Sequence, residues 1–147
     1  MTPSDQVLVM TKHHANRLGF AVLLAFFRGY GRFPRTAAEV DRVIVDEIAR
    51  QLAIEVPGDF SLSLSGRTAE RRRAEIRALL GFREATVADA ALLEAWLRDQ
   101  VPGVGAMPDQ LAALLETRCR ELSIEPPAAD RVERIVRAAI RAHDERF

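Results

Sequence analysis

The chain lacks several features that mark common protein classes. Its 147 residues include a single cysteine, which excludes an internal disulfide and is typical of a reducing cytoplasm. The longest apolar run, from Phe20 to Phe27, is far too short to span a bilayer. The first residues show no basic segment followed by an apolar stretch and a cleavage site, so no secretion signal is expected. These absences predict a cytoplasmic protein with no membrane partner.

Residue patterns of known active sites are also missing. His13 and His14 are adjacent, so on a helix they point apart and make a poor metal pair, and His143 stands alone. Cys119 lies on an apolar helix face, where a cysteine is usually part of the core. There is no glycine-rich phosphate loop and no nucleophile elbow. We therefore expect no enzyme, no metal and no cofactor.

Charge is balanced overall but unevenly distributed. The formal net charge is zero, and Lys12 is the only lysine, so the basic residues are almost all arginine. The segment 66–83 holds six arginines, whereas acidic residues dominate from Glu84 to Asp130. The segment 12–35 holds basic residues and no acidic ones, namely Lys12, Arg17, Arg28, Arg32 and Arg35. Arginine suits bidentate contacts to phosphate and guanine, although an arginine-rich composition explains the bias equally well.

Helix start and stop signals are frequent and strand signals nearly absent, which predicts an all-α fold. We expect a compact multi-helix domain of about seven helices. The first is expected to be capped by Ser4, and another is expected to end at Pro102. A capping-box pattern at 36–39 predicts the start of a third helix, whose buried face would hold Val40, Val43, Ile44, Ile48 and Leu52.

Two pairs of segments are similar to each other. Residues 50–57 (RQLAIEVP) resemble 120–127 (RELSIEPP), and residues 69–80 (AERRRAEIRALL) resemble 129–140 (ADRVERIVRAAI). The match is short, so chance similarity is an alternative. If the repeat is real, it predicts two tandem helix-turn-helix-like units. We place the first unit at 1–83 and the second at 84–147, and the two could pack as one domain.

The second helix of each unit carries a row of arginines. On the helix of segment 66–83, Ile76, Leu79 and Leu80 are expected to be buried, with Arg72 close to this apolar side. The arginines expected to face away, or to lie on the flank, are Arg67, Arg71, Arg73 and Arg77. On the helix that starts near Asp130, Val132, Val136, Ala139 and Ile140 are expected to be buried. Its arginines are Arg131, near the start, and Arg134, Arg137 and Arg141 along the opposite edge.

These rows have two interpretations. A helix with arginines at i, i+3 and i+7 matches the DNA major groove, where arginine reaches guanine edges and phosphates. Alternatively, Glu70, Glu75, Asp130 and Glu133 can pair with the arginines, and the rows are then ordinary solvated helix faces.

Several motifs resemble one family. They are residues 17–21 (RLGFA), 31–34 (GRFP), 66–68 (GRT), 73–83 (RAEIRALLGFR) and 124–137 (IEPPAADRVERIVR). Together they resemble the N-terminal region of transposases of the replicative Tn-three family, in order and over almost the whole chain. The resemblance implies an all-helical DNA-binding domain that recognises the terminal inverted repeats of a bacterial transposon. The catalytic DDE carboxylates of that family belong to a later region, and none can be assigned to this chain.

Two departures from the family pattern are visible. The run 69–73 is less basic than in the family and has no histidine, and the sequence stops where the family continues. We therefore expect either an excised domain or a short relative without the catalytic part.

The sequence thus predicts a non-catalytic, nucleoid-associated DNA-binding module. Its partners would be double-stranded DNA of the transposon ends and other transposase subunits. The two arginine rows would form two DNA contact surfaces, and the basic residues of 12–35 would bind phosphates. The alternative is a protein-interaction module of the transposition complex, whose surface would be the acidic region from Glu84 to Asp130.

Overall fold

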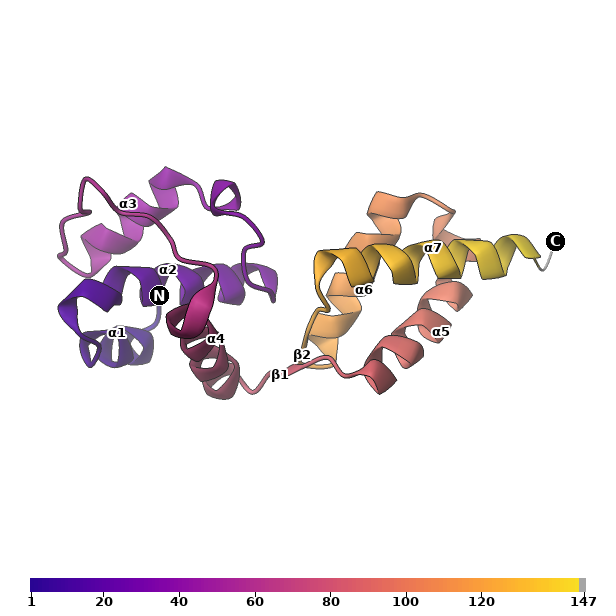
Figure 1. Cartoon of the computed structure of the whole chain (residues 1–147), viewed down its shortest axis with the longest axis horizontal. Helices are drawn as coiled ribbons and strands as arrows, with labels where there is room; N and C mark the ends of the chain where they lie inside the picture. The colour runs from indigo at the N-terminus through magenta and orange to yellow at the C-terminus, as the bar shows by residue number, and fades with distance from the viewer. Residues whose placement is uncertain (146–147) are drawn as a thin grey trace. The chain divides into compact units, whose positions relative to one another are not determined.

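Helices account for most of the chain, which confirms the predicted all-α class. The computed structural model describes residues 1–145, and within them are seven α-helices, one short 3-10 turn and two strands of two residues each (Figure 1). The chain divides into two compact units, residues 1–79 and 80–147. No helix among the described residues is long and apolar enough to cross a membrane.

Unit 1 is built around the apolar helix α2, which supplies Phe20, Leu24 and Phe27 to the core. Helices α1 and α3 pack against α2, and α4 contributes the buried Ala69 and Ile76. The elements of this unit are α1 (Pro3–Met10), α2 (His14–Tyr30), the 3-10 turn η1 (Ala37–Glu39), α3 (Arg42–Gln51) and α4 (Gly66–Leu80).

Two helix starts in unit 1 differ from the prediction. Helix α1 is capped by Thr2 and not by Ser4, because the Thr2 hydroxyl accepts a hydrogen bond from the Asp5 backbone N–H at 3.1 Å. Thr36 makes no side-chain cap, since residues 37–39 form only a 3-10 turn. Asp41 caps α3 instead, with its carboxylate accepting from the Val43 N–H at 3.0 Å.

The predicted buried faces of α3 and α4 were also partly wrong. Val43 is 71% exposed and Ile44 is exposed. The buried residues of α3 and its C-cap follow the spacing i, i+3, i+4 and i+7, at Val45, Ile48, Ala49 and Leu52. Ile48 and Leu52 are buried as predicted, whereas Val45 takes the buried position expected for Val43 and Ile44.

On α4 the buried stripe passes through Ala69 and Ile76, whereas Leu79 is exposed. Ala69, Arg72 and Ile76 are spaced i, i+3 and i+7, so Arg72 lies on the side of α4 that faces the core. This agrees with the prediction that Arg72 lies close to the apolar side.

Unit 2 is a three-helix arrangement in which α5 and α6 both pack against α7 (Figure 1). Its core includes Leu97, Leu115, Cys119 and Val136. The elements are β1 (Arg83–Glu84), α5 (Val87–Val104), α6 (Pro108–Glu121), β2 (Ile124–Glu125) and α7 (Ala129–Glu145). Helix α5 continues through Pro102 to Val104 and ends at Gly105, whose positive φ of 93° stops it.

The sequence repeat has a counterpart in the backbone. Ala53 and Ser123 occupy equivalent repeat positions, and they are the non-glycine residues with positive φ within residues 1–145, at 54° and 57°. Each follows a helix whose C-cap is an equivalent leucine, Leu52 or Leu122. Each unit therefore has a helix, a left-handed turn residue, and then an arginine-bearing helix, α4 or α7.

Candidate nucleic-acid interface

Unit 2 has an open groove of about 840 Å³ between α5 and α7. Four arginines of α7 line it, and all four are residues of the predicted second DNA contact surface: Arg131, Arg134, Arg137 and Arg141. Its apolar lining includes Val87 and Ala91 from α5 and Ile135 and Ala138 from α7. The row arises because burial of Val132, Val136 and Ala139 turns the arginines of the same helix outward.

The arginines of the groove form only weak ion pairs within residues 1–145. Arg134 lies 3.8 Å from Asp130 and Arg137 lies 3.3 Å from Glu133, and both are exposed pairs within α7. Exposed pairs of this spacing contribute only about 0.3–0.5 kcal/mol, so a phosphate or a base edge can replace the carboxylate. Arg131 and Arg141 have no ion-pair partner among residues 1–145. Among the described residues that line the groove, Glu94 is the only acidic one.

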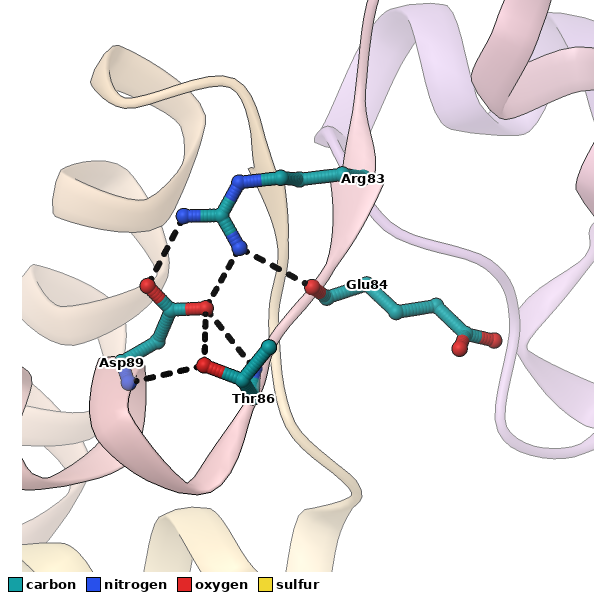
Figure 2. A network of polar contacts seen from close by, with 4 residues as sticks. All are labelled: Arg83, Glu84, Thr86 and Asp89. Carbon is teal, nitrogen blue, oxygen red and sulfur yellow. Dashed lines mark hydrogen bonds and ion pairs between the residues drawn. The ribbon is translucent and has the colours of Figure 1, made fainter.

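A polar network fixes the start of α5, which forms one side of this groove. Figure 2 shows the Arg83 guanidinium bound to both carboxylate oxygens of Asp89, at 2.5 and 2.8 Å. Asp89 also accepts from the Thr86 backbone N–H at 2.7 Å, and its own N–H donates to the Thr86 hydroxyl, which completes a capping box. The Arg83 hydrogen bond is the largest cause that holds the pKa of Asp89 below its ordinary value.

The two strands connect the same region to α7. Strand β1 pairs in parallel with β2, with Arg83 opposite Ile124 and Glu84 opposite Glu125. Because β1 precedes α5 and β2 precedes α7, the pairing holds the beginnings of the two helices together. Sequence reasoning did not single out Arg83, and the Thr-x-x-Asp pattern at 86–89 is the signal that could have indicated its partner.

The arginines of α4 divide into two groups. Arg67 and Arg71 are exposed, line a shallow surface with Glu70 and Ala74, and have no partner within the described residues. Arg73 is half-buried, and its guanidinium donates to the Leu64 backbone oxygen at 2.8 Å, so it supports the loop before α4. Arg77 is half-buried and also has an interaction partner. Of the predicted first contact surface, the structure therefore leaves Arg67 and Arg71 open.

The basic residues of 12–35 have structural partners in unit 1. Lys12 pairs with Glu75 and lies over the Phe20 ring. Arg17 donates to the backbone oxygens of Met10 and Lys12, at 2.9 and 3.0 Å. These contacts hold the turn between α1 and α2 and its link to α4, so their use in phosphate binding stays a prediction.

The three remaining arginines of that set lie around the end of α2. Arg28 pairs at 2.7 Å with Asp5, a carboxylate that is only 1% exposed. Burial raises the pKa of Asp5, but the hydrogen bonds from Arg28 and Thr2 outweigh this and lower it overall. Arg32 pairs with Glu39 at 2.6 Å. Arg35 is exposed, and its backbone N–H donates to the same Glu39 carboxylate.

Arg72 packs against the backbone of α2, a contact that the sequence indicated only in part. Its guanidinium lies against the backbone of Gly19 in α2, so close that a Cβ on this glycine would be 2.7 Å from Nη1. Its polar contact is the Asn16 amide oxygen at 3.3 Å, which is a neutral group. Burial lowers the pKa of Arg72. A glycine inside an apolar helix is the sequence signal for such close packing.

No group of three or more His, Cys, Asp or Glu side chains within residues 1–145 is placed to hold a metal ion. Cys119 is fully buried, as predicted, and burial raises the pKa of its thiol to about 11, so the reactive thiolate is disfavoured.

The comparison with known families covers nearly the whole chain. A family model described as a domain of unknown function (DUF4158) matches residues 2–139. The sequence has no match among curated proteins. The family description assigns no activity. By the extent of this match, the chain belongs to the DUF4158 family.

Proposed function

We propose that the chain is a non-catalytic, sequence-specific DNA-binding module. The observation that carries this proposal is the row of four arginines along the α5–α7 groove, which a rigid helix holds and whose ion pairs within residues 1–145 are weak and exposed. A cluster of this kind is the electrostatic signature of a surface that binds nucleic acid. The exposed Arg67 and Arg71 of α4 provide a second basic surface on the other unit.

In this proposal α7 is the helix that contacts base edges in the major groove. An α-helix fits the width of the major groove, and a guanidinium can donate two hydrogen bonds to the O6 and N7 atoms of guanine. Arg134, Arg137 and Arg141 span about two turns of α7, so they would reach neighbouring bases or the phosphates beside them. Arg131, near the start of α7, and the arginines of α4 would mainly contact phosphates, which give affinity and register.

The proposed target rests on the motifs that resemble those of Tn-three family transposases. We propose that the module recognises the terminal inverted repeats of a transposon. The basic residues of 12–35 would contribute only where a phosphate replaces their present intramolecular partners, so we assign them a smaller share of the affinity than the sequence suggested.

An electrophoretic shift of the whole chain tests the proposal. It should use a duplex with a candidate inverted repeat taken from the DNA that flanks the gene, a scrambled duplex of equal composition, and a stated salt concentration. We expect tighter binding to the repeat by about tenfold or more, since each lost base contact costs about 1–3 kcal/mol. Equal binding to both duplexes, or no binding to either, would contradict the proposal.

One observation favours a second candidate function. The α5–α7 groove has an apolar lining, and Val87 at its edge is 75% exposed, which DNA phosphates would not use. An assembly module that binds another transposase subunit would bury these residues. In that case Val87→Ser would weaken subunit association and leave duplex binding unchanged, whereas Arg137→Ala would not alter any preference between duplexes.

A further inference from the structure

A second, smaller pocket lies inside unit 1, between α2 and α4. It measures about 210 Å³ and is lined by Asn16 and Phe20 of α2, Thr68, Arg71, Arg72 and Glu75 of α4, and Lys12. We propose that this pocket is a phosphate-binding site in which Arg72 and Arg71 hold the phosphate oxygens. If the phosphate belongs to DNA, the inference rests on the proposed function; as a phosphate site it stands on its own geometry.

The charges in the pocket are not balanced. Within the part of the chain that the structure describes, Glu75 is the only acidic residue in the lining, and it pairs with Lys12. The guanidinium of Arg72 has the neutral Asn16 amide as its polar contact, and Arg71 has no partner within residues 1–145. Two arginines therefore lie beside a cavity that offers them no free carboxylate. A phosphate supplies the missing negative charge and can accept from both guanidinium groups.

Arg72 is held in place for this role. Gly19 has no side chain, so the guanidinium can lie directly against α2, and all three of its outer atoms Nη1, Nη2 and Cζ are within 3.1 Å of the position that a Cβ would take. Burial against α2 removes water from Arg72 and lowers its pKa. A guanidinium that has already lost part of its hydration loses less on binding an anion, which favours a bound phosphate over bulk solvent.

Glycine substitutions offer a test that leaves every charge in the chain unchanged. Gly19→Ala places a methyl group on the Arg72 guanidinium and displaces it, and only the far end of a flexible side chain has to move. Gly29→Ala is the matched control, because it is on the same helix and its added Cβ would have no atom within 4 Å. Alanine favours the helix at either position, so both variants should fold.

The measurement is a titration of the whole chain with inorganic phosphate, followed by the NMR signals of the arginine Nε–H groups, with sodium chloride at equal ionic strength as the reference. We expect saturable shifts of Arg72 in the wild type and in Gly29→Ala. In Gly19→Ala we expect the affinity to fall about tenfold, as when a charged hydrogen bond is lost. Shifts no larger than with chloride, or equal affinity in the two glycine variants, would overturn the site.

A second arm identifies the source of the phosphate. Arg72→Gln should weaken binding to inverted-repeat and scrambled duplexes alike and reduce the slope of log K against log salt by about 1. Arg50→Gln is the control with equal charge loss, since Arg50 is exposed on α3 and pairs with Glu47 of the same helix. Loss of phosphate binding without any change in duplex affinity would instead assign the site to a free phosphate compound.

The two proposals can fail separately. Loss of the preference for inverted-repeat DNA with intact phosphate binding would contradict the reading role of α7 alone. Absence of phosphate binding with intact DNA preference would contradict the α2–α4 site alone.

Discussion

The arginine side chains fall into two groups according to the carboxylates that they contact. Arg28 and Arg83 bind carboxylates that are almost buried, Asp5 and Asp89. In contrast, the arginines of α7 face exposed carboxylates of their own helix or none within the described residues. The sequence could place these arginines on faces of helices, but it could not reveal partners such as Asp5 and Arg28, which lie 23 positions apart.

Glu39 provides a pH-dependent prediction at the residue scale. Its hydrogen bond from Arg32 is the main cause that lowers its pKa from 4.5 to about 2. A pKa lowered by folding means that the ionised carboxylate stabilises the fold above about pH 4.5, and this contribution disappears as the pH falls toward 2. We expect Glu39→Gln to lower the free energy of unfolding by about 1 kcal/mol at pH 7, with allowance for solvent screening.

Urea unfolding of the wild type and Glu39→Gln at pH 7 and at pH 3 measures this effect. The difference between the two proteins should shrink at the lower pH. A difference that stays constant over this range would show that the Arg32 pair does not stabilise the folded state through charge.

Cys119 gives a second prediction at this scale. Because the thiol is fully buried and its pKa is raised to about 11, we expect it to react with a thiol reagent only when unit 2 opens. Labelling of the native chain at pH 8 should be orders of magnitude slower than labelling in urea. Equal rates in the two conditions would mean that the core around α6 is open in the native protein.

At the scale of elements, the two arginine-bearing helices follow turns of the same kind. Ala53 and Ser123 adopt positive φ, a conformation that costs a residue with a Cβ about 1 kcal/mol or more. We expect Ser123→Gly and Ala53→Gly each to raise the free energy of unfolding, or to leave it unchanged where unfolded-state entropy offsets the gain. Thermal unfolding measures both, and a clear loss of stability in either would contradict the left-handed turn.

Helix α5 depends on the cap that also orients Asp89. Thr86→Ala removes the hydroxyl that accepts from the Asp89 N–H at 3.1 Å, and we expect a loss of about 1 kcal/mol of stability. Thr86→Ser keeps the hydroxyl and serves as the control. If the serine variant loses as much as the alanine variant, the effect comes from the lost methyl group and not from the cap.

Local signals predicted the helices better than their faces. The spacing of Val132, Val136 and Ala139 predicted the buried side of α7, because one apolar stripe dominates that helix. On α3 the consecutive residues Val43, Ile44 and Val45 are all apolar, so the local pattern does not determine which of them faces α2, and the structure buries Val45. The basic surfaces could likewise be predicted only in part. The arginine row of α7 follows from helical periodicity, whereas the pocket at Arg72 depends on a contact with Gly19, which is distant in the sequence.

At the scale of the whole molecule, each unit provides one basic surface. Unit 2 carries the α7 row, and unit 1 carries Arg67 and Arg71 together with the Arg72 pocket. In our proposal the first surface selects the sequence and the second mainly adds affinity for the DNA backbone. Substitutions on the two surfaces should therefore have different effects, one on preference between sequences and the other on binding to all of them.

The ratio of dissociation constants for scrambled and inverted-repeat duplexes tests this account most directly. It should be measured at about 0.15 M salt, close to physiological ionic strength, for the wild type and for a variant with Arg134, Arg137 and Arg141 changed to alanine. The account predicts a ratio of about ten or more for the wild type and a ratio near one for the variant. A wild-type ratio of one, or a ratio that the three substitutions leave unchanged, would contradict it.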